Sequence, residues 1–471
     1  MISLMSEREP SQVREHGSYN AADVVAWKES VFMTALFATV GIILAADDPF
    51  QQHGKLRVLT SKTHLEHADG TAFFFLADTC WTGPALSKTA AEWQTYLDDR
   101  KAKRFSAVQF NMLSPWRTAP TDADGNTAYR IVDGQLIPNE TFYRRLDQRF
   151  KAINDAGLLA VPVLCWANSR LDPGKTLTEA QITDVVRFQF RRYEKMNALW
   201  VLAGDTGYRQ DAELWKRVGR AVFGAKPDAL VTTHPDGENF PWTSDRWADE
   251  TWLNVWGYQS GHGDSDKTLR WLTNGPVAEY GRRGQYTRPV INLEPPYEAH
   301  NGYATGKPHP PLHVRRAVYW SLLNAPPAGV TYGGHGVWSW HTKPGEHPTG
   351  HHGTGPAPHW REGLKHPGSA QMTHVRNLFE SLPWTQLRPA PELVHDQPGI
   401  ADPKKFVASA ATLDRKTTVF YFPPETVQAL VPNLGPNDSF FWFDPRTGQR
   451  QTDIGFRPDP KEDWVLVMQR R

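Results

Sequence analysis

Two carboxylates that each follow a short apolar run are the residues of this sequence best suited to chemistry. The run Val290–Leu293 delivers Glu294 into a turn, and two prolines come next, so the strand cannot continue and the turn is rigid. The run Leu199–Ala203 leads through one glycine to Asp205 in the same way. Paired Asp and Glu side chains do acid/base and nucleophilic work in sugar hydrolysis. Taken singly, each has a plain alternative, because a strand-end Asp or Glu also caps a following helix or turn.

Other polar and aromatic residues also follow apolar runs and form a second set of candidates. The sequence has 19 tryptophans, and tryptophan offers a flat apolar face with one polar edge, which suits stacking on a sugar ring. We expect substrate contacts from Asp78, Trp81, Trp116, Trp166, Trp256, Tyr258, Gln259, His262, Glu298, His335, Trp338 and Trp340. Asp78, Tyr258, His262 and His335 are the preferred members. Core packing or turn formation is an equal alternative for each one alone.

The elements that position these residues follow from alternating strand and helix patterns. Apolar runs of strand length lie at 73–77, 106–111, 159–165, 198–203, 230–233, 252–256, 290–293 and 329–332. Helical patterns separate them, and two begin with capping boxes, Thr89 to Glu92 and Thr178 to Gln181. Eight such units predict an α/β fold, a (β/α)8 TIM barrel over 47–384 whose candidate residues share the C-terminal rim. A doubly wound open sheet is the competitor, but the glycine-rich turn after the first strand is missing.

The pattern changes after a proline-rich linker at 383–398. Short strands are expected at 406–409, 417–422, 440–443 and 464–468, separated by turn residues and without a helical pattern. These features predict a small all-β sandwich domain over 385–471. It has no cluster of reactive residues of its own, so we expect it to pack against the barrel.

The composition excludes several kinds of protein. The net charge is +1, so nothing favours a nucleic acid or an acidic membrane as partner. The two cysteines, Cys80 and Cys165, exclude a disulfide scaffold, and we expect buried thiols, with one bridge as the alternative. A stretch rich in Gly, Pro and His at 341–367 has irregular histidine spacing, which favours a loop bordering the site over a metal site. We expect no metal and no cofactor.

The first 46 residues are set apart from the fold. An apolar run at 31–46 follows Lys28 and is too short for a comfortable membrane span, so it is typical of a signal-peptide core. This predicts a secreted or periplasmic protein without a stable membrane partner. An uncleaved membrane anchor and a buried helix of the fold stay open as alternatives.

Five motifs, taken in order, resemble the apiosidase-like glycoside hydrolases of family 140. They are 74–81 (FFLADTCW), 199–205 (LWVLAGD), 258–262 (YQSGH), 292–298 (NLEPPYE) and 331–338 (TYGGHGVW). The resemblance covers about 60–470 and implies a secreted barrel enzyme acting on plant cell-wall polysaccharide, with a C-terminal domain of the type called collagen-binding. It also implies a catalytic pair at Asp205 and Glu294. The departures are Ala77 in place of an expected Gly and the inserted Pro296, and neither removes a carboxylate.

The resemblance implies a retaining, exo-acting glycosidase of pectic polysaccharide. By analogy with retaining barrel hydrolases, Asp205 is the general acid/base and Glu294 the nucleophile, although the sequence leaves the reverse assignment open. An acid that keeps its proton near neutral pH needs an apolar or negatively charged setting. Two other functions stay open: a barrel glycosidase for another glycan, such as an arabinofuranoside or mannoside, and a non-catalytic glycan-binding protein.

Overall fold

The computed structural model describes residues 48–114, 117–208, 210–238, 247–427 and 438–470. Residues 49–471 form one compact unit. The expected signal segment at 1–46 and the candidate Trp116 lie outside the described residues. No helix in the described ranges is long and apolar enough to cross a membrane.

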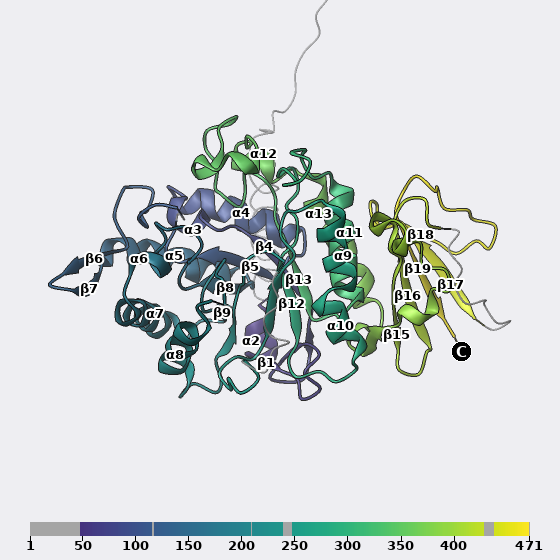
Figure 1. Ribbon diagram of the computed structural model, residues 1–471, viewed down its shortest axis with the longest axis horizontal. Helices are drawn as coiled ribbons and strands as arrows, with labels where there is room; N and C mark the ends of the chain where they lie inside the picture. Colours follow the sequence, from purple (N-terminus) through teal and green to yellow (C-terminus); the bar gives the residue numbers. More distant parts are fainter. Residues whose placement is uncertain (1–47, 115–116, 209, 239–246, 428–437, 471) are drawn as a thin grey trace, which may run out of the picture. The chain divides into compact units, whose positions relative to one another are not determined.

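Eight parallel strands form a near-closed barrel, as the sequence predicts (Figure 1). They are β4 (Phe75–Thr79), β5 (Ala107–Asn111), β8 (Leu159–Val163), β9 (Leu199–Val201), β10 (Leu230–Thr232), β11 (Trp256–Gln259), β12 (Val290–Glu294) and β13 (Gly329–Tyr332). The ladder runs without a break from β10 back through β4 and on to β11. In the described part of the chain no ladder joins β10 to β11, but the N–H groups of Asn254 and Val255, just before β11, donate to the carbonyl of Val231 in β10 at 2.9 and 3.2 Å and bring the two ends of the sheet together.

Helices surround the strands, with α4, α5, α7 and α8 on one side in Figure 1 and α9, α10, α11 and α13 on the other. The long helices are α4 (Ala90–Ala102), α5 (Glu140–Asp155), α7 (Glu179–Tyr193), α8 (Ala212–Phe223), α9 (Asp266–Asn274), α10 (Pro276–Arg282), α11 (Pro311–Leu323) and α13 (Pro367–Glu380). The short ones are α2 (Pro49–His53), α3 (Gly83–Leu86), α6 (Pro173–Thr176) and α12 (Trp360–Gly363). Both predicted capping boxes are present, and they open α4 and α7.

Alternation along the strands divides the barrel into an interior and an outer layer. In β4, Phe75 and Ala77 belong to the interior core, whereas Leu76 packs in the outer layer beneath the helices. Because successive side chains of a strand point to opposite faces, Asp78 is directed outward with Leu76. The alternation of inward and outward side chains along each strand, here called its parity, determines which strand-end residues point into the mouth of the barrel.

The expected sixth strand at 252–256 is displaced by four residues. The structure instead has a turn, in which the N–H of Leu253 donates to the carbonyl of Glu250, and β11 begins at Trp256. The run is buried except at Asn254, which is half-buried, but burial alone does not require an extended strand. Its last residues serve to close the barrel.

Two small sheets have no counterpart in the predicted pattern. The strands β1 (Leu56–Val58), β2 (Leu65–His67) and β3 (Ala72–Phe73) form an antiparallel sheet, and β6 (Tyr129–Val132) pairs with β7 (Gln135–Pro138). Leu56, Leu65 and Phe73 join the interior core of the barrel. The first sheet therefore covers one end of that core.

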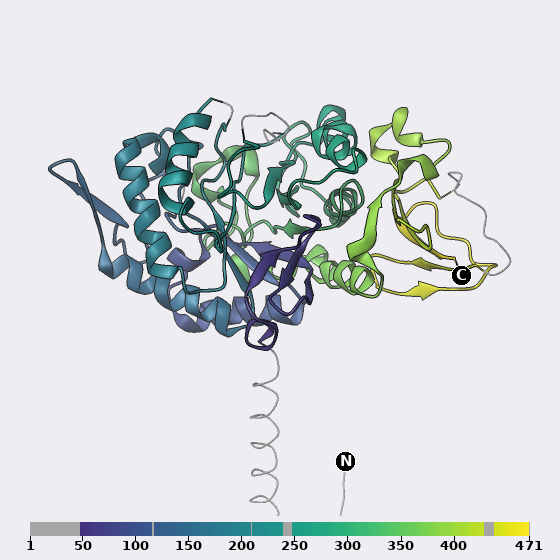
Figure 2. The same cartoon turned by 90° about the horizontal axis from the view of Figure 1, so that it is seen from below.

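The C-terminal strands form one six-stranded antiparallel sheet within the described residues, rather than the expected sandwich of two sheets (Figure 2). Its strands are β14 (Leu387–Pro389), β15 (Ala408–Thr412), β16 (Thr417–Phe422), β17 (Ser439–Phe443), β18 (Arg450–Gln451) and β19 (Trp464–Gln469). A second sheet is unnecessary because Val419, Tyr421 and Val467 pack into the outer core of the barrel. Phe420 and Leu466 belong to a smaller cluster of their own.

A buried ion pair joins the C-terminal sheet to the barrel. The Arg315 guanidinium on α11 lies 3.0 and 2.5 Å from the two carboxylate oxygens of Asp463, and the Tyr421 hydroxyl donates to the same carboxylate at 3.0 Å. The rings of Tyr319 and Tyr421 stack at 4.7 Å alongside it. The two cysteines, Cys80 and Cys165, are buried free thiols, as expected.

Asp463→Ala is expected to destabilise the protein by about 3–5 kcal/mol, because it leaves the buried Arg315 charge without its carboxylate. Chemical denaturation followed by far-UV circular dichroism measures this change. The control is Glu392→Ala, which removes an exposed ion pair with Arg415 and should cost at most about 1 kcal/mol. Equal effects of the two substitutions would contradict a structural role for the buried pair.

Candidate active site

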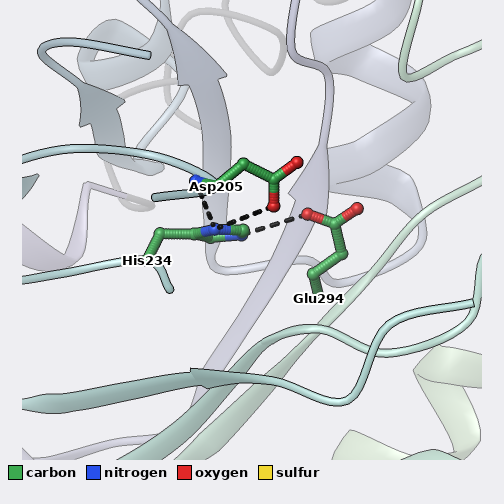
Figure 3. Close-up of side chains that lie close together, drawn as sticks. All are labelled: Asp205, His234 and Glu294. Carbon is green, nitrogen blue, oxygen red and sulfur yellow. Dashed lines mark hydrogen bonds and ion pairs between the residues drawn. The ribbon is translucent and has the colours of Figure 1, made fainter. Parts of the chain in front are cut away.

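Asp205 and Glu294 face each other inside the barrel mouth (Figure 3). A carboxylate oxygen of each and a ring nitrogen of His234 all lie within 4.8 Å of one another. The Asp205 side chain is 20% exposed and the Glu294 side chain 7%. Within the described part of the chain, these three side chains are also the group whose donor atoms could hold a metal ion.

Asp205 lies in the loop after β9, and its own backbone adopts the left-handed conformation. Asp205 has φ of 50°, a conformation that costs a non-glycine residue about 1–3 kcal/mol. Gly204 precedes it, and a Cβ at that position would collide with the Trp166 ring. The Gly-Asp pair thus lets the chain pass under an indole and then turn the carboxylate into the cavity.

An irregularity in the pairing of β12 with β11 determines where the Glu294 side chain points. Tyr258 of β11 pairs with Asn292, but the next residue, Gln259, pairs with Glu294, so the ladder skips Leu293. Such a bulge changes the face to which the following side chain points. As a result Leu293 lies in the interior core and Glu294, the next residue, lies in the cavity on the same side.

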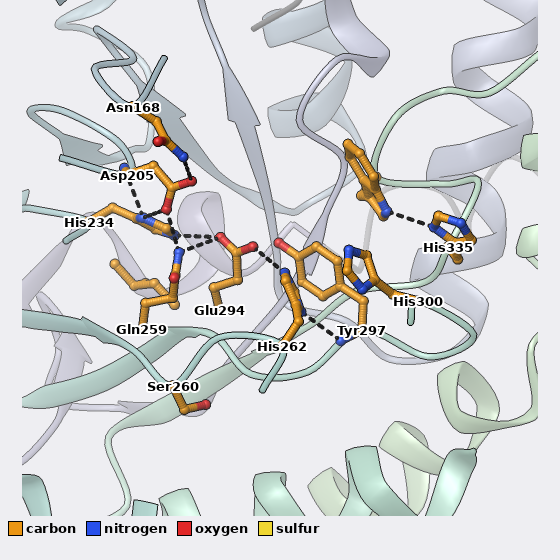
Figure 4. A network of polar contacts seen from close by, with 12 residues as sticks. Asn168, Asp205, His234, Gln259, Ser260, His262, Glu294, Tyr297, His300 and His335 are labelled. Carbon is orange, nitrogen blue, oxygen red and sulfur yellow. Dashed lines mark hydrogen bonds and ion pairs between the residues drawn. The ribbon is translucent and has the colours of Figure 1, made fainter. Parts of the chain in front are cut away.

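Three donors surround the Glu294 carboxylate (Figure 4). The His262 ring nitrogen Nε2 lies 2.8 Å from Oε1, the Gln259 amide donates to Oε2 at 3.0 Å, and His234 Nε2 lies 3.1 Å from Oε2. The Nδ1 atoms of His262 and His234 accept backbone N–H groups of Tyr297 and Asp205, each at 3.4 Å. These contacts assign the ring proton of each histidine to Nε2, where it faces Glu294.

Asp205 has fewer donors and a negative neighbour. Its Oδ1 accepts a 2.6 Å hydrogen bond from Gln259, and its Oδ2 accepts one of 2.8 Å from Asn168. Burial, followed by the charge of Glu294, raises the pKa of Asp205 to about 6. At Glu294 burial also acts to raise the pKa, but hydrogen bonds from His234 and His262 outweigh it and lower the pKa to about 2.

The environment therefore divides the pair into a carboxyl that keeps its proton and a carboxylate that stays ionised. Burial alone would lower the pKa of His234, but its hydrogen bond to Glu294 and the charges of both carboxylates raise it. Two carboxyl groups whose environments move their pKa values apart are suited to the acid and nucleophile roles.

A cavity of about 490 Å³ contains the pair and has aromatic walls. Of the predicted substrate residues, Trp81, Trp166, Gln259, His262 and Trp338 line it. Trp81 and Trp166 meet edge to face at 4.9 Å, and both rings contact His234. Gln259 and His262 contact the carboxylates directly, so part of the predicted set lies at the site.

Other predicted substrate residues point away from the cavity, because the parity of their strands directs them to the outer layer. Asp78 accepts a 2.7 Å hydrogen bond from Tyr96 and pairs with Arg100 at 2.9 Å. Trp256 packs under Arg288, 4.1 Å from its ring centre, and Tyr258 packs in the outer core.

The remaining predicted residues support the loops around the cavity. Glu298 accepts a 2.6 Å hydrogen bond from Tyr332, and Trp340 stacks on Trp360 at 4.2 Å. His335 accepts a 3.1 Å hydrogen bond from the Trp338 indole and so stands behind the cavity wall.

Several residues of the site were not among the predicted candidates. Asn168 and His234 contact the carboxylates, while Tyr297 and His300 line the wall. His234 directly follows the fifth apolar run, so the strand-end rule that selected Asp205 applied to it as well. Asn168 lies beyond the third run, and only the folded loop brings it to Asp205.

Comparison with solved structures agrees with this architecture. A glycoside hydrolase family 5 protein from Bacteroides vulgatus superposes with a TM-score of 0.74 over 89% of this chain and 94% of its own, at 21% sequence identity. A second protein, described as a glycoside hydrolase, gives a TM-score of 0.73 over 89% and 98%, also at 21% identity. At this identity the similarity shows the fold. No protein with a curated description matches the chain.

The family model described as "Apiosidase-like, catalytic domain" matches residues 60–386. Together with the barrel fold, this match defines the protein as a glycoside hydrolase. The chain belongs to the apiosidase-like family.

Glu294→Gln is expected to lower the pKa of Asp205 from about 6 toward its ordinary value of 3.8, because one of the two causes of the upward shift is removed. Burial remains, so the pKa should stay above that value. Carbon-13 NMR titration of labelled aspartate carboxyls measures the change. Glu298→Gln, on the same loop but bonded to Tyr332, is the matched control and should leave the titration of Asp205 in place. An unchanged pKa in Glu294→Gln would show that the two carboxyls are not coupled.

Proposed function

We propose that this protein is a retaining glycosidase in which Glu294 is the nucleophile and Asp205 the general acid/base. The observation that carries the proposal is the close approach of the two carboxyl groups, which place one oxygen of each within 4.8 Å of the other. Retaining glycosidases separate the carboxyl groups by about 5–5.5 Å, whereas inverting enzymes need about 6.5–9.5 Å to fit a water between them. The direction of the two pKa shifts supports this division of roles.

In the first step the Glu294 carboxylate attacks the anomeric carbon of the sugar. The glycosidic bond breaks, and Asp205 gives its proton to the departing oxygen. In the second step Asp205, now ionised, takes a proton from a water that attacks the same carbon and releases Glu294. The sugar leaves with its original anomeric configuration, and both carboxyls return to their starting states.

The Gln259 amide supports both steps. Its nitrogen donates to Asp205 at 2.6 Å and to Glu294 at 3.0 Å, so one group holds the two carboxyls together. The two histidines donate to Glu294 from fixed tautomers and keep it ionised in the free enzyme. When Glu294 forms the ester, its negative charge disappears, which lowers the pKa of Asp205 and prepares it to act as a base.

The substrate that we propose is a plant cell-wall, pectic polysaccharide from which the enzyme removes a terminal apiose-type sugar. Two observations support it: the match to the apiosidase-like family model, and a cavity whose tryptophan walls are almost fully buried, which suits the end of a chain. We also propose secretion through the apolar segment at 31–46 and a supporting role for the C-terminal sheet beside the barrel.

Asp205→Asn and Glu294→Gln are expected to lower turnover on an aryl apioside by about 10²–10⁴-fold or more, because each removes a group that transfers a proton or forms the covalent bond. Oligosaccharide affinity should change by less than about tenfold, since the stacking rings stay in place. Azide should partly rescue Asp205→Asn with retention, because azide needs no general base. Glu346→Gln, an exposed carboxylate in the loop after β13, is the control. Unchanged turnover in both site variants would place the chemistry elsewhere.

The pH profile of kcat/KM is expected to fall as the pH rises above about 6, because Asp205 then loses the proton that the leaving group needs. It should also fall as the pH approaches about 2, where Glu294 becomes protonated. Initial rates on an alkyl glycoside measure both limbs. A glycosyl fluoride needs no proton on its leaving group, so the alkaline limb should disappear with that substrate. An alkaline limb that persists with the fluoride would assign it to another residue.

A further inference from the structure

Tyr303 is an exposed aromatic residue at the mouth of the catalytic cavity. It is 56% exposed, and it is the only aromatic side chain among the large exposed apolar residues of the described chain. It also lines the cavity together with Glu294 and His262. A large ring exposed at the mouth of a cavity offers a flat apolar face that a ligand entering the cavity can contact.

Hydrogen bonds to neighbouring segments hold the backbone of the loop that carries Tyr303. The N–H of Tyr303 donates to the carbonyl of His262 at 3.1 Å, and the N–H of Asn301 donates to Thr354 in the neighbouring loop at 3.1 Å. Asp264 accepts the N–H of Ala304 at 2.9 Å. These bonds fix the backbone on both sides of the ring, so Tyr303 is presented in one place before any ligand arrives.

The ring stands edge-on to the inner wall. Its centre lies 5.8 Å from that of His262 and 5.6 Å from that of His300, both in T-shaped contact. The phenol of a tyrosine, with an ordinary pKa of about 10, keeps its proton near neutral pH. The residue therefore offers a neutral ring and a hydroxyl within the field of both carboxyls.

Exposure distinguishes the two ends of the cavity. Trp81, Trp166 and Trp338 are each about 2% exposed and form the deep wall, whereas Tyr303 stands at the mouth. Asp205, the residue that protonates the leaving oxygen, is more exposed than Glu294. The leaving side of the scissile bond therefore lies toward the mouth.

We propose that Tyr303 is a stacking platform for the first sugar ring beyond the scissile bond, on the leaving-group side. This subsite rests on the proposed function, because it takes the direction of the bond from the role of Asp205. The ligand is a pyranose or furanose ring of the polysaccharide that carries the terminal sugar, and the Tyr303 ring contacts its C–H face.

The test compares two substrates that share the terminal sugar. A pectin-derived oligosaccharide has a ring on the leaving side, and the corresponding glycosyl fluoride has none. Tyr303→Ala should reduce kcat/KM on the oligosaccharide by about three- to tenfold, the range of one aromatic stacking contact, and leave the fluoride within about twofold. Tyr303→Phe and Tyr303→Trp should retain the oligosaccharide activity because they keep a ring. Leu413→Ala, an exposed apolar residue in a turn of the C-terminal sheet, is the surface control.

Equal losses on both substrates, or no loss on the oligosaccharide, would overturn the subsite. A binding measurement separates its failure from failure of the proposed function. In the Glu294→Gln background, calorimetry with the intact oligosaccharide should show weaker binding when Tyr303→Ala is added. A wild-type protein that cleaves neither substrate, combined with that loss of affinity, would refute the glycosidase mechanism while keeping the platform. Unchanged affinity would refute the platform.

Discussion

The repulsion between two carboxyl groups within 4.8 Å of each other is the constraint on which the rest of the site depends. In a partly buried cavity this repulsion is poorly screened, so one carboxyl must keep its proton or both must be held by donors. The structure does both. The Gln259 amide uses one nitrogen to bridge the pair. Two histidines, His262 at Oε1 and His234 at Oε2, stabilise the negative charge of Glu294. Asp205 is therefore the carboxyl group that keeps its proton.

Placing the pair requires two departures from regular backbone geometry. Asp205 takes a left-handed conformation, and the ladder between β11 and β12 skips Leu293. Each departure is unfavourable locally and persists because the surrounding barrel fixes it. Asn292, on the outer face, donates to the hydroxyls of Ser260 and Ser321 at 3.0 Å, which connects the irregular strand to its neighbours. Regular strands would have turned Glu294 outward with Asn292.

The sequence predicts the barrel well because its signals are local. Apolar runs, capping boxes and turn residues specify eight strands and their helices, and all eight strands are present, the sixth displaced by four residues. The same reasoning identified Asp205, Glu294, Gln259 and His262 near one another. It failed at Asp78 and Tyr258, because position at a strand end gives the height of a residue on the barrel but not the face to which it points. Counting alternate residues predicts the face only where the strand is regular, and the strand is irregular just before Glu294.

The residues next to Asp205 and Glu294 in the sequence do not predict which carboxyl is the acid and which the nucleophile. Nothing in the neighbouring residues of Asp205 or Glu294 distinguishes an acid from a nucleophile, since both follow apolar runs. The difference arises from donors on other strands: His234 follows β10, and Gln259 and His262 belong to β11 and the loop after it. Glu294 is contacted by three donors and Asp205 by two. Glu294 is the less exposed of the two carboxyl groups, yet it is the one that carries the negative charge. Hydrogen bonding therefore outweighs burial at Glu294, burial prevails at Asp205, and the direction of the proposed reaction follows from that asymmetry.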